Sequence, residues 1–125
     1  YSDGRTHGGY GLETTPRELA KFALFIARDG KNKQGLPILS SQWIENMVKP
    51  HVNADYLDLH FGYQWWVDTQ RNIFSMNGHG GQYAFIIPDK QMLVVMTALP
   101  NTQGDYQITT DEALILVEDI IAAAN

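Results

Sequence analysis

One histidine set among glycines is the residue of this sequence best placed for chemistry. Residues 77–83 read N-G-H-G-G-Q-Y and run directly into the apolar stretch A-F-I-I at 84–87. Glycine serves where a backbone needs positive φ or where another group must approach closely. Three glycines around His79 therefore predict an accessible titratable side chain at the start of a strand. The alternative is a tight turn that carries a surface histidine, which is common at strand ends.

The sequence lacks the nucleophile patterns that would complete such a site. A nucleophile elbow needs G-x-S-x-G, and a Ser-x-x-Lys site needs a lysine one helical turn after the serine to take its proton. The four serines, at positions 2, 40, 41 and 75, are followed three residues later by Arg, Trp, Ile and Gly. There is no cysteine, which excludes a cysteine nucleophile, disulfides and thiolate metal sites. The sequence thus offers a histidine without a visible nucleophile.

Two other polar segments do not define a site. Residues 51–60 contain two histidines and two aspartates, but their spacing matches no metal-binding pattern, so we interpret them as a solvated loop. Residues 8–11 are rich in glycine but lack the spacing of a dinucleotide-binding loop, and no predicted strand precedes them. We therefore predict neither a metal ion nor a cofactor.

Composition and charge narrow the class of partner. The 125 residues fall in the range of one domain, and a hydrophobic content of 44% is too high for a disordered segment. Fourteen acidic against nine basic residues, without a basic run, argue against nucleic acid and anionic membrane surfaces. No apolar run approaches the roughly 20 residues of a membrane helix. The chain begins with Tyr1 rather than methionine, so we expect a processed start or a piece of a longer protein.

Three helices are predicted, two near the beginning and one at the end. Residues 15–18, T-P-R-E, combine a capping box with proline at the first helical position, and the helix that they open ends at the D-G pair 29–30. A second, shorter helix begins at residue 40 or 41 and is closed by Pro50. The last helix begins at residue 109 or 110 and has one apolar side.

Strands are predicted where the apolar pattern changes to a period of two. They cover residues 61–67, 73–76, 83–87 and 92–99. Residues 92–99 are apolar on both faces, which predicts a strand inside the sheet and covered on both sides. Within the first strand, Trp65 and Trp66 are interpreted as core residues rather than site residues.

The order of these elements predicts an α+β fold, with an antiparallel sheet flanked by helices. We expect one unit over residues 1–125, with a helical part over about 15–50 and a sheet with the C-terminal helix over about 61–124. The apolar residues exceed what these elements can bury among themselves. An absent neighbour in the sequence would explain this excess, and the exposed strand edge and apolar surface would favour self-association.

Four segments, in order, resemble one enzyme family. Residues 9–22, G-Y-G-L-E-T-T-P-R-E-L-A-K-F, resemble the G-G-L-x-S/T-T-x-x-D-L-A-R-F segment of the serine β-lactamase and penicillin-binding-protein family. The likeness is to its class C-like branch, which includes D-amino-acid peptidases, esterases and 6-aminohexanoate-dimer hydrolases. Residues 39–44, L-S-S-Q-W-I, resemble its L-S-x-E-W-V helix start, and residues 61–67 resemble its Y-G-x-G-W-W strand. Residues 78–89 resemble its strand pair G-H-G-G-Q to P-D.

The resemblance covers about residues 9–121 and implies the C-terminal part of a β-lactamase/transpeptidase-like fold. In that family the Ser-x-x-Lys helix and the Tyr-x-Asn motif lie upstream, and no tyrosine here has asparagine two residues later. The resemblance therefore implies a fragment that carries the third motif alone and is inactive by itself. Its parent would act on an amide, ester or β-lactam through an acyl-enzyme. Family members are often exported, which implies a periplasmic or extracellular location.

The resemblance also implies roles for the turn. His79 stands at the Lys/His position of the third motif, where it would orient the substrate and support proton transfer. Gly80 takes the middle position, and Gly81 would be small so that an acyl substrate can lie along the strand edge. The backbone N–H of Gln82 would be one oxyanion-hole donor, a contribution of about 3–4 kcal/mol. Tyr83, like the side chain of Gln82, would help to shape the pocket.

Replacement of the family's lysine by histidine has a chemical consequence. Histidine is largely neutral near pH 7, which favours esterase, amidase or peptidase chemistry over a carboxylate-bearing β-lactam.

Two alternatives remain open. The chain could be a non-catalytic binding or regulatory module that retains the scaffold, or an α/β-hydrolase that uses residues 79–81 as an oxyanion loop. The absence of G-x-S-x-G argues against the latter.

Overall fold

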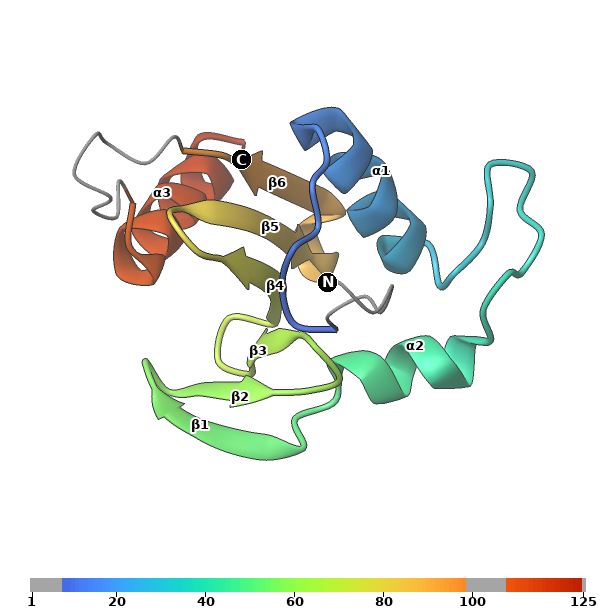
Figure 1. Ribbon diagram of the computed structural model, residues 1–125, viewed down its shortest axis with the longest axis horizontal. Helices are drawn as coiled ribbons and strands as arrows, with labels where there is room; N and C mark the ends of the chain where they lie inside the picture. The colour runs from blue at the N-terminus through green and yellow to red at the C-terminus, as the bar shows by residue number, and fades with distance from the viewer. Residues whose placement is uncertain (1–7, 99–107, 125) are drawn as a thin grey trace, which may run out of the picture.

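The computed structural model of the chain describes residues 8–98 and 108–124. The first part holds two helices, α1 (Pro16–Ala27) and α2 (Ser41–Val48). The strands are β1 (Val52–Tyr56), β2 (Leu59–Phe61), β3 (Trp66–Asp68), β4 (Ile73–Gly78), β5 (Gln82–Ile87) and β6 (Met92–Met96). A short 3-10 turn (Pro88–Lys90) joins the last two strands, and α3 (Thr110–Ala123) ends the chain (Figure 1). The predicted α+β fold is confirmed.

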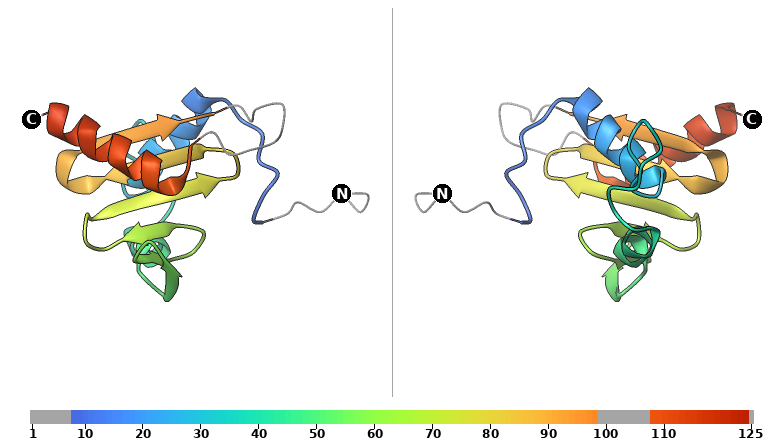
Figure 2. Two further views of the ribbon diagram at one scale, coloured as in Figure 1. Left: turned by 90° about the vertical axis from the view of Figure 1, so that its left-hand side faces the viewer. Right: turned by 90° about the vertical axis from the view of Figure 1, so that its right-hand side faces the viewer.

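The six strands form one antiparallel sheet in sequence order, β1 to β6. Figure 2 shows this sheet between α3 on one face and α1 on the other. Apolar side chains of β4, β5 and β6 pack against Ala113, Leu114 and Val117 of α3. On the opposite face, Ala23 and Ile26 of α1 and Ile44 of α2 pack with a second group from the sheet. The sheet thus has a hydrophobic core on each face.

The helices begin where the sequence predicts, because their capping side chains are local. The Thr15 hydroxyl accepts the N–H of Glu18 at 3.3 Å at the start of α1. At α3, Thr109 and Glu112 form a complete capping box. The backbone N–H and the hydroxyl of Thr109 both donate to the Glu112 carboxylate at 2.8 Å and lower the pKa of Glu112. No helix in the described ranges is long and apolar enough to cross a membrane.

The prediction of a loop over residues 51–60 is wrong, because this segment contains the β1–β2 hairpin. The left-handed residues Leu57 and Asp58 make its turn, and the left-handed Asp55 lies within β1, where the register shifts between Asn53 and Tyr56. β1 is the edge strand, and its Val52 side chain is exposed. Main-chain pairing rather than side-chain burial therefore holds β1, and such a strand leaves little apolar alternation to detect.

The predicted strand over 61–67 is interrupted. The N–H of Gly62 donates to the carbonyl of Trp65 at 2.8 Å, and Gln64 has a φ of 67°, so the chain turns between β2 and β3. A Cβ on Gly62 would lie 2.2 Å from the carbonyl oxygen of Met47, so only glycine lets this turn lie on the end of α2. Tyr63 is consequently exposed, while Trp65 is buried in the core as predicted.

β6 is not inside the sheet as predicted, since within the described residues it pairs with β5 alone. Its two faces are nevertheless both covered, one by α1 and the other by α3. Cover from two helices makes the strand apolar on both faces without a second strand neighbour. Residues 8–14 contain no helix or strand, and the last residue of the predicted strand over 92–99 lies outside the described residues.

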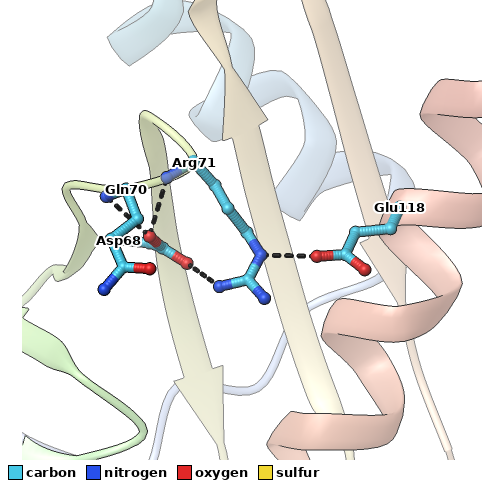
Figure 3. A network of polar contacts seen from close by, with 4 residues as sticks. All are labelled: Asp68, Gln70, Arg71 and Glu118. Carbon is cyan, nitrogen blue, oxygen red and sulfur yellow. Dashed lines mark hydrogen bonds and ion pairs between the residues drawn. The ribbon is translucent and has the colours of Figure 1, made fainter.

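A polar network ties the β3–β4 turn to α3 (Figure 3). Asp68 is 3% exposed, and its carboxylate accepts the backbone N–H groups of Gln70 and Arg71 at 3.0 and 2.9 Å. The Arg71 guanidinium donates to Asp68 at 2.9 Å and to Glu118 at 2.5 Å. The hydrogen bond to Glu118, followed by that to Asp68, raises the pKa of Arg71. The arginine therefore fixes the side of α3 that lies toward β4.

Candidate active site

The predicted glycine turn joins β4 to β5. Gly78 pairs with Gln82, so residues 79–81 form the connection. Gly80 and Gly81 have φ of 79° and 92°, a backbone region that L side chains rarely adopt. His79 is exposed. The structure therefore contains an accessible histidine in a turn that requires glycine.

The two left-handed glycines lie in different surroundings. Among the described residues, no heavy atom lies within 4 Å of a Cβ placed on Gly80, although Gly80 itself is buried. A Cβ on Gly81 would lie 3.0 Å from the Cβ of Ala98 and 3.4 Å from that of Ile108. Gly81 is thus small because the segments after β6 and before α3 pack on it. The open space beside the turn lies at Gly80.

Two hydrogen bonds hold the turn to the residue Ala98, which follows β6. The N–H of Ala98 donates to the Gly81 carbonyl at 3.1 Å, and the Gln82 side-chain amide donates to the Ala98 carbonyl. Both main-chain groups of Ala98 are engaged. A turn held in this way keeps its N–H groups in fixed directions, as electrostatic stabilisation of a developing charge requires.

Tyr83 lies inside the molecule rather than at a pocket. Its ring belongs to the core beneath α3 and stacks on Phe85 with ring centres 5.6 Å apart. Its hydroxyl donates to the Ile108 carbonyl at 3.1 Å and lies 3.4 Å from the Thr110 hydroxyl oxygen. Tyr83 therefore connects β5 to the start of α3 and can affect the site only by positioning the turn at residues 79–81.

Asn77 is a polar residue of this region that the sequence did not single out. It pairs with Tyr83 across β4 and β5, two residues before His79. Its side-chain oxygen Oδ1 is buried and has no hydrogen-bond partner within the described part of the chain. An asparagine before glycine signals a turn in sequence, and this signal gave no hint of a buried acceptor.

The end of β4 beside His79 has an open edge. β3 pairs with β4 only at residues 73–75, so residues 76–78 have no strand partner on that side within the described ranges. An open edge of this kind presents main-chain groups to an extended ligand. His79, the space at Gly80 and this edge are adjacent along the chain, and together they make the candidate site.

No described serine is placed to act as a nucleophile here. Ser40 caps α2, where its hydroxyl accepts the N–H of Trp43 at 3.1 Å. Ser41 opens α2 and lines a hollow that is separate from the turn, and Ser75 is buried in β4. Ser2 lies outside the described residues. Within residues 8–98 and 108–124, no group of three or more His, Cys, Asp or Glu side chains could hold a metal ion.

A hollow among the described residues lies away from this site. It has a volume of about 860 Å³ and opens between α1, α2 and the end of the sheet at Pro88. Leu24, Ile44 and Phe74 are among its apolar walls, and Arg28 is among its charged ones. It borders the start of β4 and the end of β5, whereas residues 79–81 join the other ends of these strands. The histidine and the hollow are therefore separate features.

Comparison with known proteins agrees with this architecture. The Beta-lactamase family model matches residues 1–117, while no curated protein matches the chain. A solved structure named "Putative 6-aminohexanoate-dimer hydrolase from Bacillus anthracis" superimposes with a TM-score of 0.67 and 22% sequence identity. The match covers 91% of this chain and 29% of that one, so the chain spans less than a third of the length of that protein. The chain belongs to the beta-lactamase family.

Proposed function

We propose that this chain is the C-terminal portion of a serine hydrolase that works through an acyl-enzyme, with its nucleophile in preceding polypeptide. The observation that carries the proposal is the exposed His79 beside the open space at Gly80, in a region where no described serine is placed to react. Family membership supports the hydrolase class, and the 29% coverage of the structural neighbour supports a longer parent.

His79 takes the chemical role in this proposal. A histidine at a glycine-cleared turn can hydrogen-bond a substrate and transfer a proton as the serine attacks and the leaving group departs. Gly80 leaves room for the acyl group, and the open edge of β4 accepts an extended substrate. The histidine thus orients the substrate, while the serine and its base come from the remainder of the parent.

The other turn residues support this arrangement. The backbone N–H of Gln82 is assigned as one oxyanion donor, and it lies at the start of β5, opposite Gly78. Gly81 lets Ala98 and Ile108 pack against the turn, and we assign it this positioning role in place of substrate clearance. Tyr83 positions the turn through its bond to Ile108.

The proposed substrate is a small amide or ester. The Bacillus anthracis protein is named a putative hydrolase of the 6-aminohexanoate dimer, which supports an amide for the present chain. A histidine in place of the family's permanently charged lysine suits such a substrate better than a carboxylate-bearing β-lactam, which the lysine charge would attract.

Covalent labelling tests the proposal. The chain and its full-length parent are each exposed to a fluorophosphonate and to a penicillin, and intact masses are measured. We expect an adduct on the parent alone, at a serine before residue 1, and a His79→Gln parent should label at least about 100-fold more slowly. An adduct on the isolated chain would refute the site assignment. No adduct on either would favour the non-catalytic module.

We also propose that the isolated chain self-associates. Large apolar side chains are exposed on both layers, among them Phe22 of α1 and Leu116 of α3. Apolar surface of this extent on a small domain favours association. Light scattering over a range of concentrations should give a mass above 14.1 kDa, whereas a clean monomer without binding of hydrophobic dyes would contradict this.

A further inference from the structure

Asn77 lies where β4 loses its neighbour on one side. β3 begins at Trp66, which pairs with Ser75, and the residues before it, 62–65, form a turn. No strand of the described ranges therefore lies beside Asn77 on that side, although β5 pairs with it on the other. The position is two residues before His79, at the open edge of the candidate site.

One hydrogen bond in the β2–β3 turn shows where the main chain of Asn77 points. The N–H of Gly62 donates to the carbonyl of Trp65 at 2.8 Å, so these two residues direct main-chain groups toward each other. Main-chain groups point to alternate sides along a strand, so Trp66 faces β4 and its partner Ser75 faces β3. Asn77, two residues after Ser75, has the same direction. Its N–H and C=O groups therefore point out of the open edge.

A second hydrogen bond, on the other side of β5, gives the same direction. The N–H of Ala98 donates to the Gly81 carbonyl at 3.1 Å, so Gly81 faces β6 and the next residue, Gln82, faces β4. Gln82 pairs with Gly78, which therefore faces β5, and the preceding Asn77 faces the opposite way. The register is regular in both strand pairs that this step crosses. The pairing of the sheet thus determines the direction of both free groups of Asn77.

The side chain of Asn77 lies on the α3 face of the sheet. Directly paired residues of an antiparallel sheet have side chains on the same face, and Asn77 pairs with Tyr83, whose ring lies beneath α3. The side-chain oxygen Oδ1 is buried without a hydrogen-bond partner in the described part of the chain. The nitrogen Nδ2 has no partner there either, but it is not among the buried atoms. The amide therefore buries its acceptor and presents its donor outward.

This arrangement lowers the stability of the fold. A buried acceptor without a donor loses its hydration, and an apolar β-branched residue would suit the strand without that loss. Asparagine before glycine often bonds to its own turn, but neither polar atom of this amide bonds to residues 79–81. Violations of such local rules are expected at functional sites. The outward Nδ2 of Asn77, next to two free main-chain groups, is thus the feature that the amide provides.

We infer that the hydrolase selects its acyl group through Asn77, an inference that rests on the proposed function. An extended acyl group pairs with the free N–H and C=O of Asn77. Its substituents alternate between the two faces of the sheet, so one of two neighbouring substituents lies beside Nδ2 on the α3 face. Nδ2 donates a hydrogen bond to an oxygen on that substituent. The favoured substrate therefore carries a hydroxyl or a carbonyl at this position of its acyl group.

Ester hydrolysis by the full-length parent tests the inference. Three 4-nitrophenyl esters carry N-acetylated dipeptide acyl groups: two alanines, serine then alanine, and alanine then serine. One of the two serine esters should have a kcat/KM about 10-fold above that of the dialanine ester, as one added hydrogen bond predicts. Asn77→Val should abolish this ratio and leave kcat/KM for the dialanine ester unchanged. Ser75→Ala, two residues earlier on the same face of β4, is the matched control and should keep the ratio.

Two further measurements on the parent separate binding from folding. Asn77→Asp keeps the shape of the side chain but replaces the Nδ2 donor by an acceptor, so it should also abolish the ratio. Asn77→Val should unfold at a higher urea concentration than the wild type. Equal kcat/KM for all three esters in the wild type, or a ratio that survives Asn77→Val, would overturn the inference. A lower urea midpoint for Asn77→Val would overturn it too, because the amide would then serve the fold.

The labelling experiment separates this inference from the proposed function. A fluorophosphonate adduct on the parent, together with equal rates for the three esters, would refute the role of Asn77 and leave the acyl-enzyme intact. No adduct and no ester hydrolysis would refute the proposed function, and NMR then decides the inference. The Nδ2 proton signals, assigned by their absence in Asn77→Val, should shift when the serine-containing dipeptide amides are added to the parent. Unchanged signals would overturn the inference.

Discussion

Alanine substitutions at Gly80 and Gly81 distinguish two reasons for a glycine in this turn: the positive φ of its backbone and the close packing of neighbouring side chains. Both residues have positive φ, at 79° and 92°, so each alanine would meet a similar backbone cost. Only at Gly81 would the new Cβ also crowd other atoms, 3.0 Å from Ala98 and 3.4 Å from Ile108. The pair is therefore a matched comparison in which one substitution is the control for the other.

The expected magnitudes follow from these geometries. A left-handed conformation costs an L residue about 1–2 kcal/mol, which is the whole effect expected for Gly80→Ala. Crowding in a packed region adds about 1–3 kcal/mol, so Gly81→Ala should cost about 2–5 kcal/mol. At roughly 4 °C of melting temperature per kcal/mol for a domain of this size, the two variants should be separable by thermal unfolding.

Urea unfolding of both variants, followed by fluorescence of the buried Trp65, measures the difference. Equal destabilisation by Gly80→Ala and Gly81→Ala would refute the argument that Ala98 and Ile108 determine the size of residue 81. In the full-length parent, the methyl group of Gly80→Ala would enter the proposed acyl site. The acylation rate should therefore fall by more than the loss of folded protein accounts for. Unchanged acylation would remove Gly80 from that site.

Three further predictions concern polar groups. Asp68→Ala should lower the free energy of unfolding, measured in urea, by about 2–4 kcal/mol, because three hydrogen-bond donors lose a buried carboxylate. Glu118→Gln, at the exposed end of the same network, should lower it by less than about 1 kcal/mol. Asn77→Val should raise stability by about 1 kcal/mol by removing a buried acceptor, and a loss would reveal a partner for it. Because folding lowers the pKa of Glu112, the ionised carboxylate stabilises the folded chain at pH values above 4.5, the ordinary pKa of a glutamate. This stabilisation is lost as the pH falls through the lowered pKa of the folded chain. Melting temperatures between pH 6 and 3 should therefore fall less steeply for Glu112→Gln, and parallel curves would contradict the role of its bonds to Thr109.

The sequence was sufficient for features that local chemistry determines. Thr15 and Thr109 are recognisable as caps because the groups that they bond lie three residues away, within one turn. The turn at His79 could be predicted because glycine residues mark positions of positive φ. The resemblance to the serine β-lactamase family rested on four such local segments, and the family match over residues 1–117 confirms it.

Features that depend on distant partners could not be predicted. β1 is held by main-chain bonds to β2, and its exposed Val52, Asn53 and Asp55 leave no alternation of apolar and polar residues to detect. The break at Gly62 depends on the carbonyl of Met47, which lies in another element. Gly81 is crowded by Ala98 and Ile108, which follow it by 17 and 27 residues, while the clearance of space for a substrate at this glycine stays a prediction. Sequence position alone does not reveal which atoms crowd a glycine.

These distant contacts bear on how a divided active site could assemble. Ala98 bonds to Gly81 and Gln82, and Tyr83 ties β5 to Ile108. All of these partners belong to this chain, so the turn that presents His79 is shaped before any other polypeptide binds. Preorganisation of this kind lowers the conformational cost of joining two parts of a site. Under the proposed function, the preceding polypeptide would contribute the reactive serine, and it would meet a turn that contacts within this chain have already shaped.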